Sequence, residues 1–157
     1  MKPLAALLLA AALASPAVAG DPACKGTISG AARGTFTCKL GVFEKDGSHY
    51  LVIEPLGPVE GIPGYWPGSF ELPGKPEARR YTLDQLVAGR ASVGVEGGAL
   101  YSATKTSSQR GEVTLEFRSV KPDRGAPGSF RVRGSYRARL LPVGAGKSGE
   151  VLLDVTF

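Results

Sequence analysis

Residues 129–141, SFRVRGSYRARLL, decide the predicted fold. Apolar or small side chains alternate strictly with polar ones, the pattern of a β-strand that buries one face. We expect the buried face to hold Phe130, Val132, Gly134, Tyr136, Ala138 and Leu140. We expect the solvent face to hold Arg131, Arg133, Ser135, Arg137 and Arg139. A helix would scatter these arginines around its surface, so the stretch predicts one long strand with a row of four arginines.

Two other stretches, residues 112–118 before it and 150–157 after it, alternate in the same way. If their strands flank the arginine strand, acidic side chains share its solvent face. These acids are Glu112, Glu116, Glu150 and Asp154. Opposite charges across neighbouring strands contribute about 0.2–1 kcal/mol each. The sequence therefore leaves two roles open for the row: a binding surface, or only the partner of these acids.

The rest of the chain predicts many short strands joined by turns. The 22 glycines and 12 prolines are well above average usage, and Asp46-Gly47 is a strong tight-turn signal. The one helical signal is a short turn near residues 82–88, where Thr82 can cap and Gln85 follows three residues later. We expect an all-β chain: a single-domain antiparallel β-sandwich of about 8–9 strands over residues 20–157.

Residues 1–19, MKPLAALLLAAALASPAVA, have the charged start, apolar middle and small-residue end of a secretory signal peptide. Export to the periplasm or the exterior is therefore expected, and the Ala-, Gly-, Arg- and Pro-rich composition indicates a bacterial source. In an oxidising compartment Cys24 and Cys38 are expected to form a disulfide. Strand-like residues 27–29 and 35–37 flank a Gly-rich turn, which would place the two cysteines opposite each other in a hairpin.

Two features are candidates for binding. The first is the arginine row, because residues 101–157 hold 10 basic and 5 acidic side chains. Such a row suits an acidic polysaccharide or another anionic component of the envelope, whereas export argues against nucleic acid as the partner. The second is Tyr65-Trp66 between Pro63 and Pro67, which we expect on a loop, where aromatic side chains can stack on sugars or anchor a partner.

The sequence offers little to catalysis. His49 is the only histidine and there is no C-x-x-C pair, so we expect no metal site, no cofactor and no enzymatic activity. A hydrolase with an unassigned site remains a lesser alternative. Another is a small outer-membrane β-barrel whose arginines fill a polar lumen, because Val151, Leu153 and Val155 alternate up to Phe157. The Pro-rich residues 55–76 argue against regular membrane-spanning strands. The leading expectation is an exported, non-enzymatic binding or structural module.

Overall fold

A computed structural model describes residues 23–107, 110–144 and 148–157, and the predicted signal peptide lies outside them. The chain is all-β, as predicted, and ten strands are described. Their bounds are β1 Ala23–Gly30, β2 Gly34–Lys45, β3 Ser48–Pro55, β4 Gly64–Leu72, β5 Arg80–Thr82, β6 Ala88–Gly94, β7 Leu100–Thr104, β8 Glu112–Pro122, β9 Ser129–Pro142 and β10 Val151–Thr156.

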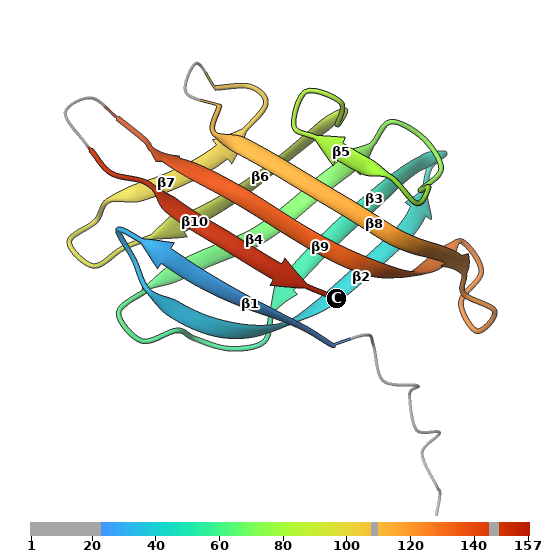
Figure 1. Ribbon diagram of the computed structural model, residues 1–157, viewed down its shortest axis with the longest axis horizontal. Helices are drawn as coiled ribbons and strands as arrows, with labels where there is room; N and C mark the ends of the chain where they lie inside the picture. Colours follow the sequence, from blue (N-terminus) through green and yellow to red (C-terminus); the bar gives the residue numbers. More distant parts are fainter. Residues whose placement is uncertain (1–22, 108–109, 145–147) are drawn as a thin grey trace, which may run out of the picture.

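The sheet closes into a barrel, which corrects the predicted sandwich. Eight strands form the antiparallel ring, in the order β1-β2-β3-β4-β6-β7-β9-β10 and back to β1. Strands β8 and β5 extend the sheet beyond β9. In Figure 1, β1, β10, β9, β8 and β5 form the front layer and cross β2, β3, β4, β6 and β7 behind them. The layers resemble a sandwich, but the β1–β2 hairpin and the β7–β9 contact join them through backbone pairing.

The arginine stretch forms β9, the longest strand, and its predicted alternation is confirmed. Val132, Tyr136, Ala138 and Leu140 are buried, while the four arginines are exposed. Gly134 of β9 lies opposite Phe117 of β8, where the backbone of β8 comes very close. A Cβ at this position would stand 1.9 Å from the Glu116 carbonyl oxygen, so glycine is required. The two strands therefore approach each other at a point that no larger residue fits.

The core lies inside the barrel and is apolar. Among the residues that the structure describes, no buried polar or charged side chain other than tyrosine is found. The largest fully buried side chains are Tyr81, Tyr136, Phe70, Phe117, Leu51 and Ile53. Alternation along each strand sends these side chains inward and the charged ones outward, because successive residues of a strand point to opposite faces.

The predicted hairpins are present at both ends of β2. Cys24 lies opposite Cys38 in the β1–β2 register, with 4.9 Å between the Cα atoms, and the predicted disulfide joins them. Asp46 and Gly47 form the β2–β3 turn with φ of 52° and 80°, the left-handed values that a tight hairpin turn requires. Local sequence signals were therefore sufficient for these connections.

The helical turn predicted near residues 82–88 is present only as a single hydrogen-bonded turn: the backbone N–H groups of Gln85 and Leu86 donate to the Thr82 carbonyl oxygen at 3.0 and 3.2 Å, and no helix forms there. The capping contact itself forms: the Thr82 backbone N–H donates to the Gln85 side-chain oxygen at 2.9 Å. Leu83 and Leu86 are buried in the core, and β6 begins at Ala88. The short segment thus serves to connect β5 to β6 and anchors there through its two leucines.

Candidate functional site

The arginine row lies on the outer face of β9, between β8 on one side and β10 on the other. Neighbouring arginines two residues apart along a strand stand about 7 Å from one another. The side chains of Arg131 and Arg137 are 67% and 74% exposed, so the row faces solvent. The acids around the row divide it into two halves, one in which carboxylates neutralise the arginines and one in which positive charge is in excess.

The half formed by Arg137 and Arg139 is neutralised. Arg137 donates to Asp154 of β10 at 3.0 Å, and Arg139 binds both Glu150 and Glu112, the latter at 3.4 Å. The hydrogen bond to Glu150 is the main reason that the pKa of Arg139 is raised above its ordinary value. The fourth predicted acid, Glu116, instead pairs with Arg80 of β5 at 3.6 Å. In this half the row is held by carboxylates.

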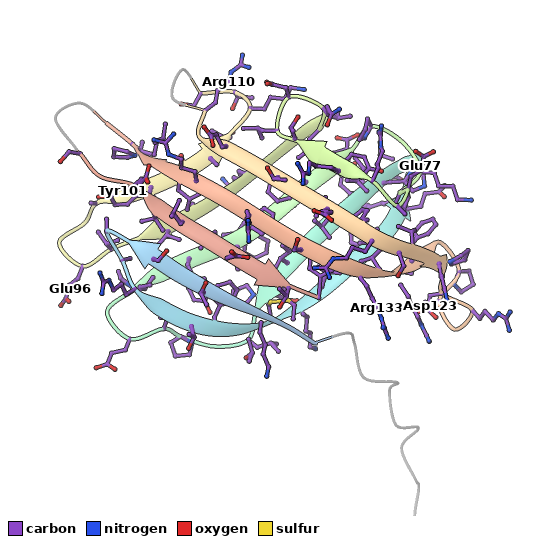
Figure 2. All side chains as sticks on the ribbon, in the orientation of Figure 1. Glu77, Glu96, Tyr101, Arg110, Asp123 and Arg133 are labelled. Carbon is purple, nitrogen blue, oxygen red and sulfur yellow. A yellow bond between two sulfur atoms is a disulfide. The ribbon has the colours of Figure 1, made fainter. Side chains whose placement is uncertain are left out.

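The half formed by Arg131 and Arg133 is not neutralised in this way. Lys121 of β8 lies directly opposite Arg131 in the register, so two cations share one cross-strand position. One carboxylate, Asp123, contacts Arg131 at 3.2 Å. In the part of the chain that the structure describes, no ion pair involves Lys121 or Arg133. We call Lys121, Arg131 and Arg133, together with Asp123, the basic end (Figure 2, where Arg133 and Asp123 are labelled).

Asp123 is held in its ionised form. Its carboxylate accepts a hydrogen bond from the Gly125 backbone N–H at 3.0 Å. That bond, followed by the contact with Arg131, lowers the pKa of Asp123 below its usual range. The basic end therefore carries three cations and one anion throughout the neutral and mildly acidic range. Sequence reasoning missed Lys121 and Asp123. Strict alternation from residues 112–118 would place Lys121 on the apolar face with Val113 and Leu115, and only the β-bulge between Phe117 and Ser119 brings it opposite Arg131.

A cleft of about 760 Å³ opens beside the basic end. Its charged lining is the basic end itself, and its apolar lining includes three half-buried phenylalanines, Phe43, Phe130 and Phe157. The cleft follows the line where β9 changes partner from β10 to β2, and we call it the seam cleft. Its volume lies in the range of about 300–1,000 Å³ that is typical of small-molecule sites.

Tyr65 and Trp66 belong to strand β4, which corrects the predicted loop. Tyr65 pairs with the buried Val93 and packs edge-on against Phe36, with 5.2 Å between ring centroids. Trp66 is the next residue and lies opposite Ser92, so the two aromatic side chains point to different faces of the strand. The structure does not bring them together as one stacking platform.

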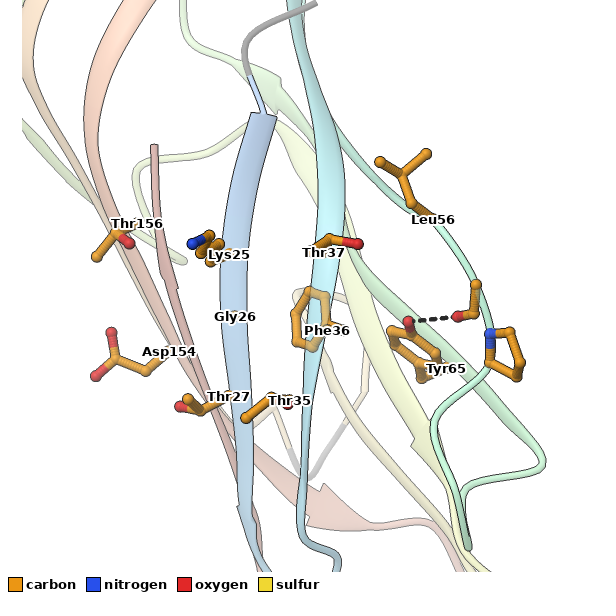
Figure 3. Close-up of a pocket in the computed structure, with 12 residues that line it drawn as sticks. Lys25, Gly26, Thr27, Thr35, Phe36, Thr37, Leu56, Tyr65, Asp154 and Thr156 are labelled. Carbon is orange, nitrogen blue, oxygen red and sulfur yellow. Dashed lines mark hydrogen bonds between the residues drawn. The ribbon is translucent and has the colours of Figure 1, made fainter.

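Tyr65 lines a second hollow, of about 700 Å³, between the β1–β2 hairpin and residues 56–58 (Figure 3). Its hydroxyl donates to the Gly57 carbonyl oxygen at 2.8 Å, and partial burial raises its pKa. The remaining lining is largely made of hydroxyl-bearing threonines with Lys25 and Asp154. This hollow is open and electrically balanced, so the basic end is the more distinctive candidate.

Catalytic groupings are sparse. The side chain of His49 is 13% exposed; its Nε2 lies 3.6 Å from a Glu44 carboxylate oxygen, and its ring centroid lies 5.8 Å from that of Phe130. Within the described ranges, no group of three or more His, Cys, Asp or Glu side chains is arranged to hold a metal ion. The same residues contain no helix that is long and apolar enough to cross a membrane.

Comparisons with known proteins add no identification. No protein-family model, curated protein or solved structure matches this chain. The site must therefore be interpreted from its own geometry.

Proposed function

We propose that this protein is an exported, non-enzymatic module that binds an anionic glycan of the bacterial envelope or exterior through its basic end. One observation carries the proposal: Lys121 and Arg131 are like charges at one cross-strand position, with Arg133 beside them and one carboxylate among the three.

Like charges directly opposite each other destabilise a sheet, by an amount comparable to the 0.2–1 kcal/mol that opposite charges contribute. The remainder of the same row shows the alternative arrangement, because Arg137 and Arg139 lie beside acids. A bound anion would compensate the basic end in the way that Asp154 and Glu150 compensate the other half. The basic end is thus suited to sulfate, phosphate or carboxylate groups spaced along an acidic chain.

Export is supported by the disulfide between Cys24 and Cys38. Disulfides persist in oxidising compartments and are rare in the cytosol of most organisms. The predicted signal peptide over residues 1–19 agrees with this location. We therefore place the protein in the periplasm or outside the cell, where acidic glycans are available and nucleic acid is scarce.

The sidedness of the barrel favours a water-exposed module over the outer-membrane alternative. An outer-membrane barrel carries an apolar band outside and polar side chains in its lumen. Here the apolar side chains, such as Leu51 and Leu153, fill the interior, and the arginines of β9 lie outside. Osmotic shock should consequently release the protein. If only detergent releases it, and its intact mass shows no covalently attached lipid that could anchor it, the membrane alternative would be favoured.

Binding is tested with polygalacturonate as the acidic glycan and dextran as the neutral one. We expect retention on immobilised polygalacturonate that falls steeply as salt rises, because exposed charges are screened over about 8–10 Å near physiological ionic strength. Arg133→Gln should weaken binding severalfold. Arg139→Gln is the matched control, since it removes the same charge from the same strand about 20 Å away. Equal loss in both variants, or retention that ignores salt, would contradict a site at the basic end.

A further inference from the structure

We infer that the seam cleft binds a negatively charged single-chain amphiphile, with the charged head at the basic end and the apolar chain in the cleft. This inference goes beyond the proposed function: it uses the same cations but adds a second class of ligand, one that carries an apolar chain. The argument depends on the origin of the cleft, on its lining and on the charges at its rim.

The cleft exists because two strands, β10 and β2, share the edge of β9 that lies opposite β8, and their pairings leave a gap between them. Along that edge β10 pairs with residues 135–140, and β2 pairs with Ser129 and Phe130 only. Reciprocal backbone hydrogen bonds of 2.7 and 3.1 Å between Gly134 and Phe157 complete the β10 side. Residues 131–133 therefore face the cleft across from Leu40 and Gly41 of β2, in an interrupted part of the barrel wall.

The lining changes from apolar to cationic over a short distance. Leu40, Val42 and Val132 are almost completely buried and form the floor. Phe43, Phe130 and Phe157 are half-buried and form the walls. Lys121, Arg131 and Arg133 lie at the same opening. A ligand with only a charged group would leave the phenylalanines in water, and a ligand with only an apolar chain would leave the cations uncompensated.

Charge complementarity selects an anion as the head of the ligand. Asp123 is the one carboxylate among the described residues that line the opening, and it already contacts Arg131 and accepts the Gly125 N–H. Arg133 and Lys121 have no acidic partner within the described ranges, so a carboxylate or phosphate can approach both. A fatty acid and a lysophospholipid share this chemistry, and the test below separates them.

Gly41 provides a way to block the cleft without disturbing the core. A Cβ at Gly41 would meet the Phe43 ring at 3.6 Å, an ordinary van der Waals contact, and Gly41 does not require a positive φ. Gly41→Leu should therefore be accommodated in the strand while its side chain occupies space that the apolar chain would use. Arg133→Gln removes the head contact, and Arg139→Gln is the control outside the cleft.

The test measures calorimetric titration of the disulfide-bonded protein with acetate, hexanoate, octanoate and decanoate, below their micelle concentrations. Burial of each methylene should strengthen binding about threefold to fourfold, so affinity should rise steeply from hexanoate to decanoate. Gly41→Leu should remove the dependence on chain length, Arg133→Gln should weaken every acid, and Arg139→Gln should change neither. Decyl maltoside, which has the chain without the charge, should bind at least tenfold more weakly than decanoate.

Titration with decanoyl lysophosphatidylglycerol distinguishes a phosphate head group from the carboxylate of a fatty acid. If it binds more tightly than decanoate and responds to the same variants, the ligand is phosphate-headed; the reverse order indicates a free fatty acid. Affinity that is independent of chain length, or unaffected by Gly41→Leu, would overturn the inference. In that case the proposed function stands if the wild-type protein still binds polygalacturonate. If it binds neither the fatty acids nor polygalacturonate, the proposed function is rejected together with this inference.

Discussion

Replacement of Tyr136 by phenylalanine should stabilise this protein, although Tyr136 lies in the middle of the core. The side chain is completely buried on β9, and its ring packs on Phe70 with 5.5 Å between centroids. Its hydroxyl is buried and has no hydrogen-bond partner among the described protein atoms. Burial also raises the pKa of this phenol well above its ordinary value, so the group stays neutral at any moderate pH.

The size of the effect follows from the unpaired hydroxyl. A buried polar group without a partner costs about 1–3 kcal/mol, because its hydrogen bonds to water are lost on folding. Tyr136→Phe removes the oxygen and keeps the ring and its contact with Phe70. After allowance for the small void left behind, the free energy of unfolding should rise by about 1–2 kcal/mol. For a domain of this size the melting temperature should rise by roughly 3–8 °C.

Tyr81 offers the matched control, because it is equally buried but hydrogen-bonded. Its hydroxyl accepts the Glu77 backbone N–H at 3.0 Å, and its ring packs against Phe117. Tyr81→Phe should therefore lower the free energy of unfolding by about 1 kcal/mol. Urea and thermal unfolding, followed by circular dichroism with the disulfide intact, measure both variants. Destabilisation by Tyr136→Phe would refute the argument and show that its hydroxyl is paired in solution.

Three further predictions concern charge, packing and the cross-link. Asp123→Asn should strengthen binding of polygalacturonate severalfold at pH 7, because it frees Arg131 while its amide oxygen can still accept the Gly125 N–H. Since the pKa of Asp123 is lowered, its carboxylate stays ionised and wild-type binding should stay level between pH 5 and 8. Unchanged affinity in the variant would count against the basic end. Gly134→Ala should destabilise the fold by about 2–3 kcal/mol in urea titration, or prevent folding, since its Cβ would overlap the Glu116 carbonyl. The control is Gly64→Ala, which has open space around it and should be within about 0.5 kcal/mol of wild type. Replacement of both Cys24 and Cys38 by serine should lower stability by about 3 kcal/mol, the value expected for a closed loop of roughly 15 residues, and a midpoint equal to that of the oxidised protein would contradict a stabilising cross-link.

Much of the local structure was predictable from residue order. The alternation of residues 129–141 identified β9 and both of its faces, and the Asp46-Gly47 pair identified a hairpin turn. These signals depend on backbone geometry within a few residues, so no knowledge of distant segments is required. The cysteine hairpin belongs to the same class, because its two strands are neighbours in the chain.

Predictions failed where distant segments decide the outcome. Tyr65 and Trp66 lie in a Pro-rich stretch whose sequence predicts a loop. Pairing with β6 makes them part of a strand, and β3 pairs with the same strand from Gly68 onward. The register shift between Trp66 and Ser69 takes up the proline that would otherwise interrupt pairing. Near residues 82–88 the capping contact forms, but the chain enters β6 at Ala88, where pairing with β4 begins, so the segment makes one turn and no helix.

The residue order alone established that the chain is all-β, which side of β9 faces water and that four arginines stand on it. Strand pairing established whether the sheet is open or closed, and which arginines are neutralised. The reason is that side-chain direction along a strand alternates with a local period of two, whereas partners are chosen by contacts between segments far apart in the chain. Arg133 and Arg139 are alike in sequence, but β8 places Ser119 opposite the first and Glu112 opposite the second.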